Sequence, residues 1–190
     1  MLKSTNFTAS KAVENQFRVN TQAQQRLIDA LNHAYHAKVL AVHWSHQDND
    51  RTGVDAFIEF ERCQIRKVDF KFRRHNHFQQ WISIETLGNV AKNQVGWAGK
   101  PSKADEIIWV RFHQNSTITD IVLCDAKQLR ELVVSRADEL RAVGDVKRSA
   151  SAGVHNRWEG EFVGIAPAEL AALMPANSFK HVRLAGGSHD

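Results

Sequence analysis

The sequence predicts a single mixed domain of the α/β or α+β class. Its 190 residues suit one domain that is large enough to bury a core without disulfides or metals. A helical spacing of apolar residues at 10–35 is followed by several strand-like segments, and then by strands and helices in mixed order. With no internal repeat, low-complexity tract or linker, we expect one domain over 1–190, with a core at about 10–133 and a C-terminal extension at 134–190.

The N-terminal segment is expected to form two successive helices. Apolar residues such as Phe17, Leu27 and Leu31 recur near the 3.6-residue period of a helix. Asn20-Thr21 interrupts that pattern, and residues of this type cap helices, so a second helix is expected from Gln22.

The next segments are rich in β-branched and aromatic residues and predict strands. Gly53 follows a polar turn and opens the strand that carries Asp55, and Glu61-Arg62 is a tight turn between two strands. The other strands expected in this part of the chain are 38–44, 64–73 and 81–86.

The second half of the chain alternates strands and helices. Asp125 is placed to cap a helix, and Pro167 suits the first turn of another. The expected order is a loop or short helix at 87–103, an apolar run at 104–112, a buried strand at 119–124, the helix after 125, a helix at 136–143, a loop at 147–158, a short strand at 161–165, the helix from 167 and a frayed tail from 185.

Composition narrows the classes of function only modestly. Lys and Arg number 25 against 21 for Asp and Glu, so the formal charge of +4 is compatible with nucleic acid without arguing strongly for it. Cys63 and Cys124 have no paired metal spacing, and neither a signal peptide nor an 18-residue apolar run is found. We therefore expect a cytoplasmic protein with no membrane partner. No nucleophile elbow, phosphate-cradling loop or dinucleotide fingerprint occurs.

The segment from Gly53 to Arg73 carries the chemistry. Side chains alternate along a strand, so Asp69, Lys71 and Arg73 should point to one face, with Asp55 on the neighbouring strand. Two carboxylates on adjacent strands can hold Mg²⁺, and a lysine beside them can orient or deprotonate a water. A solvated hairpin face with weak ion pairs is the alternative.

Asp55 followed by Asp69-Phe70-Lys71 resembles the active-site pattern of the PD-(D/E)XK nuclease superfamily. Neighbouring stretches extend the similarity over about residues 10–133, most of the chain. The chain departs from the pattern in two ways, because no proline precedes Asp55 and the helix usual after the lysine strand is not obvious. The further stretches that carry the similarity are 50–55, Phe72-Arg73, 81–86, Gly96-Trp97, 104–110 and 121–129.

The resemblance implies a restriction-endonuclease-like mixed central sheet flanked by helices, and an endonuclease that cuts DNA with Mg²⁺, Mn²⁺ being able to substitute. It implies Asp55 and Asp69 as metal ligands and Lys71 as the catalytic lysine. It also points to an acidic ligand on the first helix, for which Glu14 is preferred to Gln16 because of its charge. A homodimer that cuts both strands is compatible with it. Weaker candidates are Glu85 beside the site and Arg73, Arg74 and Trp97 as nucleic-acid contacts.

Two other functions remain open. One is a nuclease-like fold that binds nucleic acid or protein without cutting, and the other is a hydrolase of RNA or of a small molecule with the same metal chemistry. A zinc site is not favoured, because the pairs His33/His36 and His43/His46 lack further ligands at a familiar spacing.

Overall fold

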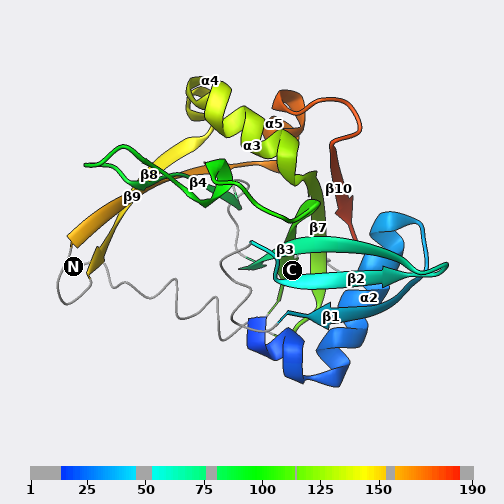
Figure 1. The fold of residues 1–190 in the computed structure, drawn as a ribbon. Coiled ribbons are helices and arrows are strands. Elements are labelled where there is room, and N and C mark those ends of the chain that lie inside the picture. The colour runs from blue at the N-terminus through cyan, green and yellow to red at the C-terminus, as the bar shows by residue number, and fades with distance from the viewer. Residues whose placement is uncertain (1–13, 46–52, 76–80, 114, 153–156, 185–190) are drawn as a thin grey trace.

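The structure is a computed structural model and describes residues 14–45, 53–75, 81–113, 115–152 and 157–184. These residues form two β-sheets with helices around them (Figure 1). The predicted mixed class, with a mixed central sheet flanked by helices, is confirmed.

The first sheet has six strands, and one of its pairings is parallel. Its order is β1-β2-β3-β6-β7-β10. Only β3 and β6 run parallel, and each other neighbouring pair in this sheet is antiparallel. The strands are β1 (Val39–Trp44), β2 (Ala56–Phe60), β3 (Gln64–Arg74), β6 (Glu106–Phe112), β7 (Ile118–Asp125) and β10 (Phe179–Arg183).

The second sheet is antiparallel and has the order β5-β4-β9-β8. Its strands β4 and β5 belong to the crossover from β3 to β6. The described part of that crossover contains these strands and the 3-10 turn η2 (Trp97–Gly99), and no α-helix. The strands are β5 (Gln94–Val95), β4 (Ile82–Asn89), β9 (Arg157–Ile165) and β8 (Asp145–Ala152).

One face of the first sheet packs against the N-terminal helices. Residues 14–19 are helical, and α2 (Thr21–Tyr35) begins after Asn20, whose side chain accepts a hydrogen bond from the Ala23 N–H, as predicted for this cap. The Phe17 ring stacks on Phe72 of β3, with 4.7 Å between centroids. A first core therefore lies between these helices and this face of the sheet.

The opposite face of β6 and β7 packs against a second core. This core includes residues of β4, β9, α3 (Ala126–Ser135), α4 (Ala137–Val143) and α5 (Pro167–Leu173). The three helices lie together, away from α2 (Figure 1). The Asp125 carboxylate caps α3 by accepting from the Gln128 N–H, and Pro167 opens α5, as the sequence predicts.

Most of the expected elements are present, with one wrong prediction and two strands that were not foreseen, the short β5 within the expected loop at 87–103 and β10. The loop expected at 147–158 contains β8 and the beginning of β9. β8 is an edge strand of small and charged residues, so it lacks the apolar alternation that reveals a strand. β10 was not foreseen, and it returns to pair with β7. The expected tail from residue 185 lies outside the described residues.

Candidate functional site

The alternation of β3 separates its side chains as predicted. Val68, Phe70 and Phe72 are buried in the first core. Asp69 and Lys71 are paired in register with Ile107 and Trp109 of β6, which belong to the second core. Since registered neighbours share a face, Asp69, Lys71 and Arg73 lie on the second-core face of the sheet.

Asp55 stands one residue before β2 and completes its pairing with β3. Its N–H donates to the Val68 carbonyl at 2.9 Å, and its carboxylate Oδ2 accepts from the Phe70 N–H at 2.9 Å. The side chain thus satisfies a backbone donor of β3 where the strand pairing ends. This bond fixes the Asp55 carboxylate beside Asp69, as the sequence predicts.

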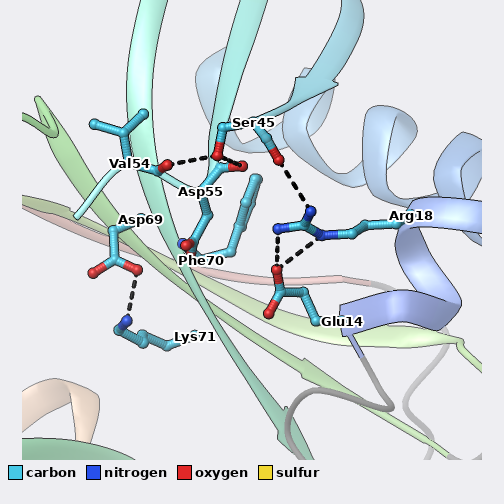
Figure 2. Close-up of polar contacts among 8 residues, drawn as sticks. All are labelled: Glu14, Arg18, Ser45, Val54, Asp55, Asp69, Phe70 and Lys71. Carbon is cyan, nitrogen blue, oxygen red and sulfur yellow. Dashed lines mark hydrogen bonds and ion pairs between the residues drawn. The ribbon is translucent and has the colours of Figure 1, made fainter. Parts of the chain in front are cut away.

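The backbone of Asp55 is held by a chain of polar contacts (Figure 2). Ser45 is buried; its N–H donates to the Asp55 carbonyl at 2.8 Å, and its hydroxyl lies 2.7 Å from the Val54 carbonyl and 2.9 Å from that of Asp55. Arg18 Nη1 donates to the Ser45 carbonyl at 3.1 Å and also pairs with the Glu14 carboxylate. Sequence reasoning missed Ser45 and Arg18, because no local pattern links a helix to the end of β1.

Glu14 therefore lies with Arg18 in this structure. The groups that act on the charge of Asp55 are Asp69, Lys71 and the Phe70 amide, and Glu14 is not among them. Its role as a metal ligand stays a prediction. Gln16, the other candidate on this helix, donates to the Ser116 hydroxyl at 2.5 Å.

The two aspartates and the lysine are electrostatically coupled. Burial, and next the negative charge of Asp69, raise the pKa of Asp55 from 3.8 to about 7, although Lys71 and the Phe70 amide oppose the shift. Lys71 Nζ lies 2.6 Å from Asp69 Oδ1. Burial lowers the pKa of Lys71, but the charges of Asp69 and Asp55 outweigh it and leave that pKa raised. Lys71 is therefore a cation held beside two carboxylates.

Lys71 also contacts the second sheet through Trp97. Its Nζ lies 4.7 Å from the Trp97 ring centroid, a cation–π distance. The Trp97 N–H donates to the Glu85 carboxylate at 2.8 Å. A Cβ at Gly96 would lie 2.3 Å from the Glu85 carbonyl, so only glycine allows η2 to approach β4 this closely. Glu85 and Trp97, both weaker candidates from the sequence, are thus joined to Lys71.

The carboxylate pair fits a hard divalent cation. Mg²⁺ in proteins is often held by one or two carboxylates, with water and substrate phosphate completing its shell. The described residues contain no group of three or more His, Cys, Asp or Glu side chains placed to hold a metal. Asp55 and Asp69 are two carboxylates, so their role as metal ligands stays a prediction; a cation held there would displace the proton of Asp55, whose pKa is raised.

The predicted nucleic-acid contacts separate onto two faces. Arg73 lies on the same face as Lys71, and its partial burial lowers the pKa of its guanidinium. Arg74 is exposed and follows the other set of alternating residues. Of these two arginines, only Arg73 shares the face of the aspartates.

No protein-family model matches this chain, and comparison with curated protein sequences gives no significant match. The function is accordingly inferred from the residues and their geometry.

The described helices include none with both the length and the apolar character needed to cross a membrane.

Proposed function

We propose that this protein is a metal-dependent endonuclease that hydrolyses phosphodiester bonds of DNA. The observation that carries the proposal is the arrangement of Asp55, Asp69 and Lys71. Burial, and next the charge of the nearby buried Asp69, raise the pKa of the partly buried Asp55 to about 7, and a lysine ammonium lies 2.6 Å from Asp69. Such an arrangement costs stability unless a cation completes it, which is typical of a functional site.

Each residue has a distinct role in the proposal. The Asp55 and Asp69 carboxylates would hold Mg²⁺ or Mn²⁺, which when bound supplies an activated water and neutralises charge on the phosphate. Lys71 stabilises the negative charge that develops on the scissile phosphate and orients the attacking water through Nζ. The Trp97 ring and the Asp69 carboxylate restrict where that ammonium can lie.

The choice of DNA rests on the resemblance of Asp55 and Asp69-Phe70-Lys71 to the PD-(D/E)XK pattern. The net charge of +4 is compatible with a polyanionic substrate. A homodimer that cuts both strands belongs to the same proposal and has no separate support.

A second candidate is a non-catalytic module that binds nucleic acid or protein. It is favoured by the contacts of Lys71, whose ammonium already has Asp69 and the Trp97 ring as partners. The side chains of Lys71 and Asp69 are only 26% and 10% exposed. In this candidate the three charged residues form a structural ion-pair cluster, and removing Lys71 would destabilise the fold.

The test is a cleavage assay on linear duplex, supercoiled plasmid, single-stranded DNA and RNA, with Mg²⁺, Mn²⁺ or EDTA. Wild type is compared with Lys71→Ala and with Lys67→Ala, which removes an exposed lysine from the same strand and the same face. The proposal expects metal-dependent cutting of DNA by wild type and by Lys67→Ala, and loss of cutting in a folded Lys71→Ala variant.

Other outcomes separate the alternatives. If only RNA is cut, RNA and not DNA is the substrate. Absence of cutting on every substrate, together with absence of metal binding, would leave the non-catalytic module. Equal cutting by the two lysine variants would remove Lys71 from the mechanism.

A further inference from the structure

The strand register places three arginines in one row across the sheet. Arg73 of β3 pairs with Arg111 of β6, Arg111 pairs with Asp120 of β7, and Asp120 pairs with Arg183 of β10. Residues paired in register point to the same face of a sheet. This arginine row, defined as Arg73, Arg111, Asp120 and Arg183, therefore lies on the same face as Asp69 and Lys71.

The arginine row directly follows the row that contains Lys71. Along β3, Arg73 is two residues beyond Lys71, and along β10, Arg183 is two residues beyond His181. His181 is in register with Val122, which pairs with Trp109, the partner of Lys71. The arginine row and the candidate centre are thus neighbours on one face of the sheet, where Trp109 and Val122 between them are buried in the second core.

Positive charge exceeds negative charge in the row. Asp120 is its one carboxylate; it lies 3.0 Å from His181, 3.9 Å from Arg111 and 4.0 Å from Arg183. Three arginines against one aspartate leave a net charge of +2, before any protonation of His181. Asp120 therefore compensates only part of the charge around it.

Arg73 is the member that most needs a further anion, and Arg183 is the member most accessible to one. Within the part of the chain that the structure describes, Arg73 has no hydrogen bond or ion pair, although burial lowers the pKa of its guanidinium. The Arg183 side chain is 83% exposed at the edge of the sheet. A partly buried guanidinium without an acidic partner is costly, and an incoming anion would offset that cost.

Arg111, between these two, is held by an aromatic ring. Its guanidinium carbon lies 5.5 Å from the Trp81 ring centroid, and the Trp81 ring is 6.3 Å from that of His181. The Arg111 side chain is 12% exposed and its Nε is buried, so only the outer part of this ordered guanidinium can reach phosphate oxygens.

We propose that the arginine row binds the backbone phosphates of a polynucleotide strand where it leaves the Asp55–Asp69–Lys71 centre. This inference rests on the proposed function, because it takes that centre as the point of cleavage. The row crosses three strand spacings of about 4.8 Å, roughly 14 Å in all. A row of this length can contact successive phosphates of one strand on one side of the cut.

The test measures how DNA binding depends on salt. The Kd of wild type for a labelled single-stranded oligonucleotide, several times longer than the row, is measured by fluorescence anisotropy in EDTA at about 50 and 200 mM salt. Arg183→Gln and Arg73→Gln are compared with Lys38→Gln, which removes one charge from a 63% exposed side chain paired with Glu61 near the opposite end of the strands. Circular dichroism establishes that each variant is folded, and Arg183 is exposed enough for its substitution to leave the fold intact.

The ratio of the two Kd values measures the number of phosphates that are neutralised. Each lost contact should reduce this ratio by about threefold, since the logarithm of the binding constant falls by about 0.7 to 0.9 per phosphate for each decade of salt. We expect this reduction for Arg183→Gln and Arg73→Gln and an unchanged ratio for Lys38→Gln.

The inference is overturned if the arginine variants match Lys38→Gln or if wild type binds no polynucleotide. Its failure is distinct from failure of the nuclease proposal. If folded wild type cuts DNA and both arginine variants keep the salt dependence of its DNA binding, phosphate binding by the arginine row is refuted and the nuclease proposal stands. If the arginine variants lose part of that salt dependence but wild type never cuts, phosphate binding by the row is supported and the nuclease proposal is refuted.

Discussion

Replacing Asp55 with Asn should stabilise the protein at alkaline pH. Asn keeps an oxygen that can accept the Phe70 N–H, so the backbone contact at 2.9 Å is retained. The change removes the negative charge that burial and Asp69 disfavour. A functional carboxylate that costs stability is the physical premise of the proposed site.

The magnitude follows from the raised pKa. Because the pKa of Asp55 in the folded protein is about 7 against an ordinary 3.8, protonation favours the folded state. This stabilisation is full below the unfolded value and is lost as the pH rises through about 7. Between pH 5 and pH 8 the loss amounts to about 2.6 kcal/mol, because the slope of about 1.36 kcal/mol per pH unit flattens as Asp55 becomes fully ionised above pH 7.

The assay is urea unfolding of wild type and Asp55→Asn at pH 5 and pH 8, followed by tryptophan fluorescence. The difference in free energy of unfolding between the variant and wild type should be larger at pH 8 than at pH 5, by roughly 2 to 3 kcal/mol in favour of the variant. Glu59→Gln is the matched control, because Glu59 lies on β2 and its carboxylate contacts His43, 2.7 Å away. The difference in free energy of unfolding between Glu59→Gln and wild type should not show the increase from pH 5 to pH 8 that is expected for Asp55→Asn.

Two results would refute this reasoning. If Asp55→Asn destabilised the protein equally at both pH values, the carboxylate would be a satisfied structural group. If the variant and wild type kept the same dependence on pH, Asp55 would not titrate near 7.

Four further predictions follow from the contacts around the site and the neighbouring arginine row. Lys71→Ala should reduce cleavage at least about 100-fold while circular dichroism stays that of wild type; an unfolded variant would instead make Lys71 structural. Arg18→Met should lower the free energy of unfolding by about 1 to 2 kcal/mol, because it removes the donor to the Ser45 carbonyl. Glu14→Gln, which can still accept from Arg18, should keep Mg²⁺ affinity unless Glu14 is a metal ligand, and calorimetry decides between these outcomes. Burial tends to raise the pKa of Asp120, but hydrogen bonds from His181 and Thr119 and the charge of Arg111 leave it lowered, so the carboxylate stabilises the fold above its unfolded pKa and this contribution is lost in acid. Asp120→Ala should therefore cost about 3 kcal/mol in urea unfolding at neutral pH and less near pH 3; an equal cost at both pH values would contradict this.

The sequence was sufficient to predict the local part of the site. A period of two along β3 is visible in the residues themselves, so the common face of Asp69, Lys71 and Arg73 could be predicted. The position of Asp55 beside Asp69 followed from two strands joined by a tight turn. The same alternation also separates Arg74 from Arg73, although both are candidate nucleic-acid contacts from the sequence.

The rest depends on pairing between segments distant in sequence. The row that joins Arg73 to Arg183 requires the registers of β3 with β6, of β6 with β7, and of β7 with β10. No local pattern specifies those registers. Similarly, the contact between Lys71 and Trp97 depends on how the crossover folds back, which is visible only in the structure.

The most direct test of the metal centre is calorimetric titration of Mg²⁺ into wild type, Asp55→Asn and Glu59→Gln. The account predicts that wild type and Glu59→Gln bind alike and that Asp55→Asn binds at least about tenfold more weakly. Because the cation displaces a proton of pKa about 7, wild-type affinity should also be about tenfold weaker at pH 6 than at pH 8. Equal affinity of wild type and Asp55→Asn, or no binding by folded wild type, would contradict a metal centre at Asp55 and Asp69.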